Sequence, residues 1–258
     1  MTMNGEVVVS FEEVLFRYND DVVLEQVGLD IHEGEFAWIV GPNGGGKTTL
    51  VKLILGLLSP VRGEVRVFGR NPVNVRHRVG YMAQQVNVDP RFPVDVLGVA
   101  LMGREGDSRR LGRYSREDHA AAMQALDQVG LADRARANFS ELSGGQMRRL
   151  LIARALTGEP DLLILDEPMA NLDPAVQRNL YELLDRLNKY LTVIMVSHDP
   201  AFVAGSVERA VCVNRRVQVH PTSEMTEDVL VDLYGEGVMR FVQHGHEFGR
   251  PRRGSNGD

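Results

Sequence analysis

The chain has 258 residues, with 29 Lys and Arg against 35 Asp and Glu, and therefore a net charge of −6. This length supports one large domain or two small ones with a sizeable buried core. The acidic balance argues against a protein that grips a nucleic-acid backbone, because phosphate binding requires a positive face. The single cysteine, Cys212, excludes an internal disulfide and a thiolate zinc site.

The N-terminal segment and the apolar runs indicate where the chain resides. Residues 1–10 carry no positive charge and no long apolar core, so they do not read as a secretory signal. The longest apolar stretch, Leu50–Leu58, is interrupted by Lys52 and Gly56, whereas a membrane span needs about 20 apolar residues. We therefore expect a soluble, cytoplasmic chain.

The first third of the chain alternates short apolar runs with turn signals, which is typical of strands. The expected strands are Val7–Val9, Val14–Phe16, Val22–Ile31, Phe36–Val40, Glu64–Phe68 and Val79–Met82. One helix is expected among them, from Lys47 to about Leu57.

The middle of the chain, from Pro93 to Asn138, has a helical pattern instead. Helices are expected at Val94–Leu101 and Arg116–Val129, on either side of a polar stretch at 103–112. Strand and helix alternation then resumes. The expected elements are helices at Gly144–Leu156 and Pro174–Tyr190, and buried strands at Leu162–Leu165 and Thr192–Val196.

Strands that alternate with helices predict an α/β fold with a mostly parallel sheet. The N-terminal strands are close together and favour an antiparallel β subdomain. The helical stretch in the middle predicts an inserted helical subdomain.

A glycine-rich segment matches the pattern G-x-x-x-x-G-K-[ST] and lies between a buried strand and a helix, the context this motif requires. It consists of Gly41, Pro42, Asn43, Gly44, Gly45, Gly46, Lys47 and Thr48, with Thr49 next. Glycines allow successive backbone N–H groups to cradle phosphate oxygens, and the helix N-terminus favours anions. We expect Lys47 to reach the β- and γ-phosphates and Thr48 to ligate Mg²⁺. The chain is thus predicted to bind a nucleoside triphosphate.

Two carboxylates, Asp166 and Glu167, follow the apolar run Leu162–Leu165. A strand buried on both faces delivers its C-terminal residues to the edge of the sheet that carries the phosphate loop. We expect Asp166 to hold Mg²⁺ through water and Glu167 to act as general base, a role worth about 10²–10⁴ in rate. Asp-Glu-Pro is also a helix-start signal, but a phosphate loop in the same sheet favours catalysis.

A histidine follows the second buried strand of this pattern, Thr192–Val196. His198 comes after Ser197, so the same geometry places its imidazole near the γ-phosphate. A lone histidine is more often structural. Its position at a strand end in a phosphate-loop sheet favours a catalytic role.

A second turn of small residues opens a helix and forms another anion-binding helix N-terminus. It follows Leu142 and consists of Ser143, Gly144, Gly145 and Gln146. One active site does not account for this turn. Together with the phosphate loop, the Asp166–Glu167 pair and His198, it resembles the nucleotide-binding subunit of ATP-binding cassette (ABC) transporters.

The resemblance implies a head-to-tail dimer, with each ATP held between one phosphate loop and the partner's signature turn. Ser143 and Gly145 would then contact the γ-phosphate across the interface. ATP and Mg²⁺ are the implied ligands. Met147, Arg148 and Arg149 follow the signature, where family members more often carry glutamine at the middle position.

The resemblance also assigns roles outside these motifs. Tyr18 matches the aromatic that stacks on adenine, the alternative being a core aromatic. Gln84 matches the glutamine that senses Mg²⁺ and the attacking water, the alternative being a polar strand end. Asp173 matches the loop that couples the two sites, and its position also suits the N-cap of the helix that starts at Pro174. Residues 85–102 would receive the membrane subunit's coupling helix.

The implied division is an ATP-binding core at residues 1–84 and 157–235, a helical subdomain at 85–156, and a C-terminal tail at 236–258. Besides a second copy of itself, the implied partners are a membrane permease and, indirectly, a periplasmic or surface metal-binding protein. No nucleic-acid partner is expected. The implied location is peripheral, at the cytoplasmic face of the inner membrane.

Four further segments, less specific than the ATPase motifs, resemble the branch of ABC transporters that takes up zinc, manganese and ferrous iron. They are residues 79–104, 211–216, 220–222 and 233–235. His244 and His246 could share a metal, or belong to a solvated tail. Cassette ATPases also serve soluble machinery, and the iron–sulfur assembly type stays open because its length is compatible. A small-molecule phosphate-loop kinase would leave the turn at Ser143 without a purpose.

Overall fold

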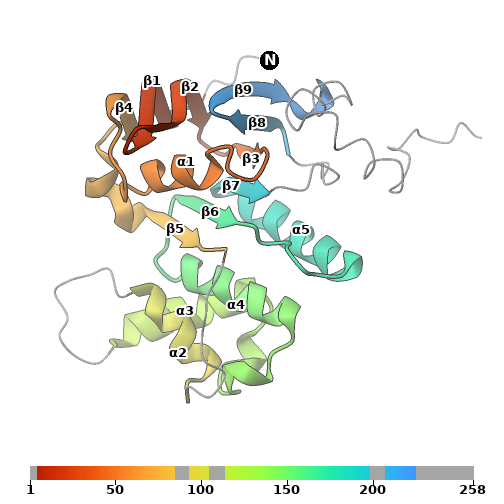
Figure 1. Cartoon of the computed structure of the whole chain (residues 1–258). Coiled ribbons are helices and arrows are strands. Elements are labelled where there is room, and N and C mark those ends of the chain that lie inside the picture. Colours follow the sequence, from red (N-terminus) through yellow and green to blue (C-terminus); the bar gives the residue numbers. More distant parts are fainter. Residues whose placement is uncertain (1–4, 85–92, 105–113, 198–206, 225–258) are drawn as a thin grey trace, which may run out of the picture.

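The computed structural model describes residues 5–84, 93–104, 114–197 and 207–224. These residues form two sheets and a set of helices (Figure 1). Within them, no helix combines the length and the apolar character needed to cross a bilayer.

The larger sheet is almost entirely parallel, as the sequence predicted. Its order is β5-β6-β7-β3-β8-β9, and only β9 runs antiparallel, against β8. The strands are β3 (Phe36–Val40), β5 (Val79–Met82), β6 (Leu162–Asp166), β7 (Thr192–Ser197), β8 (Arg209–Asn214) and β9 (Arg216–Pro221). Every residue of β3, β6 and β7 is buried, which is expected of parallel strands covered on both faces.

The smaller sheet is antiparallel, with the order β2-β1-β4, and confirms the expected N-terminal β subdomain. Its strands are β1 (Val7–Tyr18), β2 (Asp21–His32) and β4 (Arg62–Val67). The prediction of two strands within β1 was wrong. In a regular strand, residues three positions apart face opposite sides of the sheet. Phe11 and Val14 are nevertheless both buried. A register shift between them, with Glu13 at φ 47°, accommodates the exposed Glu12 and Glu13.

The helices cover the larger sheet, and those of the middle segment group together beyond β5 and β6 (Figure 1). The α-helices are α1 (Lys47–Ile54), α2 (Val96–Leu101), α3 (Arg116–Gln128), α4 (Gly144–Leu156) and α5 (Pro174–Asn188). The short 3₁₀ helices are η1 (Pro72–Arg78), η2 (Met102–Arg104), η3 (Ala132–Arg134), η4 (Phe139–Glu141) and η5 (Thr222–Glu224).

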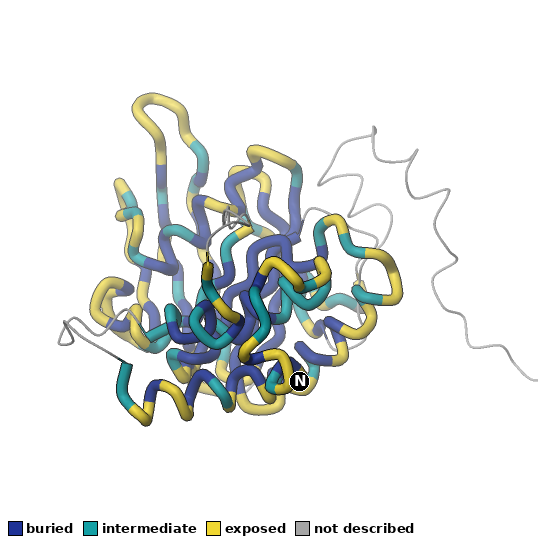
Figure 2. The backbone as a smooth tube through the Cα atoms, turned by 90° about the horizontal axis from the view of Figure 1, so that it is seen from below, coloured by how far each residue is buried: buried dark blue, intermediate teal, exposed yellow. Residues whose placement is uncertain are grey.

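Side chains that alternate along β3 divide the interior into two cores. Phe36, Trp38 and Val40 face the core shared with α2 to α5, whereas Ala37 and Ile39 face the core shared with α1 and the antiparallel sheet. Figure 2 shows the buried residues concentrated in the centre of the molecule, with exposed residues at the loops around it.

Helix ends depart slightly from the predicted bounds. Helix α1 stops at Ile54 rather than near Leu57, because Gly56 takes a left-handed turn at φ 63° and Arg76 Nε donates to the Leu55 carbonyl at 2.9 Å. Helix α2 starts at Val96 rather than Val94, because the Asp95 side chain caps it.

Candidate nucleotide site

The carboxyl ends of four parallel strands bring the predicted motifs to one edge of the sheet. In register, Val40 of β3 pairs with Ser197 of β7, and Leu165 of β6 pairs with Met82 of β5. The phosphate loop, Gln84 and the Asp166–Glu167 pair therefore follow neighbouring strand ends. Ligands of open α/β sheets bind at this edge.

The phosphate loop needs its glycines for two physical reasons. Gly46, at the start of α1, has φ 108°, which favours glycine. A Cβ atom at Gly45 would lie 2.7 Å from the Val213 carbonyl oxygen and 3.0 Å from that of Pro42. No side chain caps α1 at Gly46, and its first turn carries no acidic residue. The amide groups at this helix end are thus left for an anion.

Lys47 is buried at the base of the loop. Its Nζ atom donates to the carbonyl oxygens of Gly41 at 2.7 Å and Pro42 at 2.9 Å. Burial lowers the pKa of the Lys47 ammonium, and the nearby carboxylates of Glu167 and Asp166 raise it. Its charge is therefore stabilised mainly by the acidic pair and by the loop carbonyls.

Asp166 is the last residue of β6, and its carboxylate is almost fully buried. The hydroxyl of Tyr81 on β5 donates to Asp166 Oδ2 at 3.4 Å. Burial raises the pKa of Asp166, Glu167 raises it further, and Tyr81 and Lys47 lower it. A buried carboxylate of this kind suits a cation that replaces its lost hydration.

Glu167 lies in the turn that leaves β6. It is also buried, has φ 53°, and its backbone N–H donates to the Val196 carbonyl at 2.9 Å. Helix α5 begins only at Pro174, where Asp173 Oδ1 accepts from the N–H groups of Ala175 and Val176. The acidic pair is therefore not a helix cap, and that alternative is excluded.

The signature turn is the N-terminus of α4. Ser143 Oγ accepts from the Gln146 N–H at 3.3 Å, and Gln146 Oε1 accepts from the Ser143 N–H at 2.9 Å. This capping box satisfies two of the orphan donors at the helix end. Ser143 and Gly144 are exposed, so the outer surface of the turn stays open to a ligand.

The other predicted site residues differ in their exposure. Tyr18, at the end of β1, is 43% exposed and meets Phe16 edge to face at 4.9 Å between centroids, so it is not a core aromatic. Thr48, Gln84 and Asp173 are exposed, whereas Thr49 is buried.

Some predictions fall outside the described residues. These are His198, residues 85–92 of the expected docking surface, and His244 and His246 of the tail. Tyr81 was not predicted as a site residue, because its contact with Asp166 depends on the pairing of β5 with β6. Burial and Asp166 together raise the pKa of Tyr81 to about 12.

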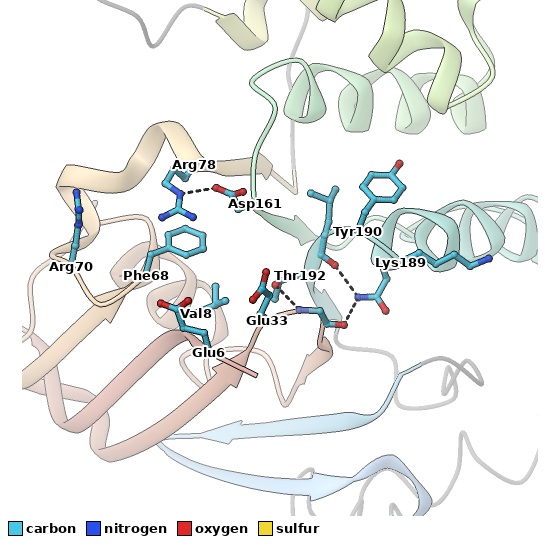
Figure 3. A pocket seen from close by; sticks show the side chains of 13 residues that line it. Glu6, Val8, Glu33, Phe68, Arg70, Arg78, Asp161, Lys189, Tyr190 and Thr192 are labelled. Atoms are coloured by element: carbon cyan, nitrogen blue, oxygen red, sulfur yellow. Dashed lines mark hydrogen bonds and ion pairs between the residues drawn. The ribbon is translucent and has the colours of Figure 1, made fainter. Parts of the chain in front are cut away.

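A separate hollow of about 430 Å³ lies at the opposite, amino-terminal edge of the sheet, and Figure 3 shows its charged lining. Arg78 Nε is 2.6 Å from Asp161 Oδ2, and the same guanidinium stacks on Phe68 at 3.8 Å. None of the predicted site residues lines this hollow. It is distinct from the nucleotide site.

The parallel sheet, the phosphate loop and the buried acidic pair define a P-loop nucleoside triphosphatase. The sequence profile described as "ABC transporter" matches residues 24–170. A "Probable metal transport system ATP-binding protein" of Chlamydia trachomatis is 39% identical, over 87% of this chain and 96% of the relative. The "Zinc import ATP-binding protein ZnuC" of Pseudomonas entomophila is 36% identical, over 97% of this chain and 93% of the relative.

Solved structures agree with these relatives. An inward-facing ABC transporter of the metal-chelate type has a TM-score of 0.79 at 31% identity, over 90% of this chain and 89% of that one. A cassette in its ADP conformation, at 24% identity and a TM-score of 0.78, has the same fold over 88% of this chain and 96% of that one. This chain belongs to the ABC transporter family. It is an ATP-binding subunit whose ATPase activity is coupled to transport, and it acts with a membrane permease.

Proposed function

We propose that this chain powers the import of a divalent transition metal, zinc or manganese, across the cytoplasmic membrane. The observation that carries the proposal is the similarity to metal-transport and zinc-import ATP-binding proteins, at 36–39% identity over at least 87% of the chain. An importer of this kind also needs an extracytoplasmic metal-binding protein, which this chain would meet only indirectly, through the permease.

Within the proposed reaction, Lys47 binds the β- and γ-phosphates and Glu167 takes the proton of the attacking water. The support is their shared burial at one sheet edge, where the Glu167 carboxylate acts on the pKa of the Lys47 ammonium. Mg²⁺ fits the donor chemistry of the Thr48 hydroxyl and the Asp166 carboxylate, and Gln84 is proposed to sense it. When bound, it neutralises charge on the phosphates. His198 is proposed near the γ-phosphate.

Two copies are proposed to sandwich two ATP molecules head to tail. The turn at Ser143 and Gly144 supports this, because both residues are exposed at a helix N-terminus. In the dimer, Ser143 and Gly145 would meet the γ-phosphate bound to the partner copy. Tyr18 would stack on adenine, and the loop at Asp173 would link the two sites.

A groove in the middle segment is the proposed docking site for the permease. It has a volume of about 430 Å³ and is lined by Pro93, Val94, Asp95, Arg136 and Asn138. Its first three residues belong to the surface that the sequence assigned to the coupling helix. Docking there would hold the chain at the cytoplasmic face of the membrane. It would also give the helical subdomain, proposed at 85–156, a function separate from ATP binding. The proposed ATP-binding core is then 1–84 and 157–235, and 236–258 is a tail.

The experiment is a measurement of cellular metal content by elemental mass spectrometry under metal limitation. Cells that lack the gene would be complemented with wild type or with Glu167→Gln. A selective deficit of one metal, restored by wild type alone, supports the importer and identifies its cargo. A normal content of every metal contradicts the cargo. Co-purification with soluble iron–sulfur assembly proteins instead of membranes would favour that alternative.

A further inference from the structure

Arg148 connects α4, the helix that begins at the signature turn, with the segments that follow β5 and β6. It lies in the second turn of α4. Its Nη1 atom donates to the Gln84 carbonyl at 3.4 Å, and its Nη2 atom donates to the Ala170 carbonyl at 3.3 Å. Gln84 follows β5 and Ala170 lies in the turn that follows β6. One guanidinium therefore joins α4 to two segments that the chain itself connects only through long intervening stretches.

The turn that receives the second hydrogen bond holds backbone strain. Glu167 and Asn171 have φ angles of 53° and 61°, in the left-handed region that is unfavourable for a residue such as glutamate and better tolerated by asparagine. Such conformations persist only where their surroundings fix them. Within the turn, the Ala170 N–H donates to the Glu167 carbonyl at 3.3 Å. Arg148 adds a bond to the same residue from outside the turn.

The position of the charge matters as well as the hydrogen bonds. Arg148 is half-buried and interacts electrostatically with Glu167. Lys47 acts on the same carboxylate from α1. Glu167 thus interacts with one cation from each of two helices, Lys47 of α1 and Arg148 of α4. A charged, forked guanidinium makes bonds that a neutral amide at the same position cannot reproduce.

We propose that Arg148 is a positioning residue for ATP hydrolysis. It ties the signature helix and the Gln84 segment to the turn that carries Glu167, so that the three parts keep one relative arrangement. The proposal rests on the base role proposed for Glu167.

The test compares four variants of the full chain: Arg148→Gln, Arg148→Lys, Arg149→Gln and Glu167→Gln. Turnover, the KM for ATP, ATP affinity by equilibrium titration and the melting temperature are measured for each. Because a small misplacement of a reacting group costs up to about 10² in rate, Arg148→Gln should lower kcat by roughly ten-fold. Its KM and ATP affinity should stay close to wild type. Arg148→Lys keeps the charge and one hydrogen bond, and should recover part of the turnover.

Arg149→Gln is the matched control, since Arg149 is the next residue of α4 and its Nη1 atom points to the turn at Gly130. It should keep wild-type turnover. If Arg148→Gln keeps wild-type turnover while Glu167→Gln is inactive, the role of Arg148 is overturned and the base role of Glu167 stands. Wild-type turnover in both removes Glu167 from the base role. The proposal is also overturned if Arg148→Gln and Arg149→Gln lose turnover equally and in proportion to a fall in melting temperature. If Arg148→Gln does not fold, unchanged turnover in Arg148→Lys overturns it.

Discussion

The Cβ atom that Gly145 lacks would lie 2.6 Å from Cγ1 of Val176, on the first turn of α5. The signature helix and the helix capped by Asp173 therefore pack directly against each other within one chain. At Gly144 the nearest atom to such a Cβ would be Leu172 Cδ2, at 3.9 Å. The packing of α4 against α5 thus requires a glycine at position 145 whether or not nucleotide is bound, whereas it does not require one at position 144.

Alanine substitutions at the two positions should affect stability differently. Overpacking costs about 1–3 kcal/mol, and replacing a helical glycine by alanine returns roughly 0.5–1 kcal/mol. Gly145→Ala should therefore lower the free energy of unfolding by about 1 kcal/mol, and Gly144→Ala should leave it equal or slightly higher. Urea unfolding of both variants measures this. Equal stability of the two would contradict the contact with Val176.

Lys47→Ala should weaken ATP binding. The variant removes a buried ammonium whose charge is available to the phosphates once they replace the carbonyls of Gly41 and Pro42. Hydrogen bonds to charged groups contribute about 1.5–3 kcal/mol, so affinity should fall by roughly 10- to 100-fold. Nucleotide titration measures the loss. Lys52→Ala, on the last turn of α1, is the control, and an equal loss there would point to general charge rather than to the loop.

The sequence was sufficient to predict the phosphate loop, the buried strands β3, β6 and β7, and the start of α5. Each of these follows from a local pattern: a glycine-rich turn, a continuous apolar run or a helix cap. It was not sufficient for β1, where the bulge at Glu12 and Glu13 depends on which side chains the core accepts. It was also not sufficient for the contacts of Tyr81 and Arg148, which require strands or helices distant in sequence to be side by side.

Ser143→Arg should abolish hydrolysis while ATP binding to the monomer remains. A bulky cation at the exposed cap would block the surface proposed to meet the partner's ATP. The same change removes the hydrogen bond between Ser143 Oγ and the Gln146 N–H, which is worth about 1 kcal/mol. Ser143→Ala, which loses only the cap, separates the two effects. Full ATPase activity of Ser143→Arg would disprove the cross-interface arrangement.

Tyr81→Phe should lower the apparent affinity for Mg²⁺, so that half-maximal turnover requires a higher Mg²⁺ concentration. The hydroxyl orients Asp166 Oδ2, and a hydrogen bond of this length is worth about 1 kcal/mol, or roughly five-fold in apparent Mg²⁺ affinity. Titration of ATPase activity with Mg²⁺ measures the shift. Tyr190→Phe changes an exposed tyrosine and should behave as wild type. An unchanged Mg²⁺ curve for Tyr81→Phe would show that Asp166 does not need this donor.

Alkaline pH should destabilise the fold through Cys212. Burial on β8 raises the pKa of its thiol to about 11, whereas an unfolded thiol has a pKa of about 8.5. Between these values the folded chain keeps a proton that the unfolded chain has lost. The stabilising contribution is thus complete below about pH 8.5 and declines as the pH rises toward 11.

The single cysteine makes this prediction simple to measure. An alkylating reagent at pH 8 should leave the native chain unlabelled and add one label in denaturant, because the native thiol is buried and protonated. Unfolding of Cys212→Ala between pH 8.5 and 11 should lose less stability than wild type. Above about pH 10, Tyr81 adds a loss of the same sign in both proteins. Prompt labelling of the native chain would contradict the burial of Cys212, and identical pH curves would remove its titration from the alkaline limit.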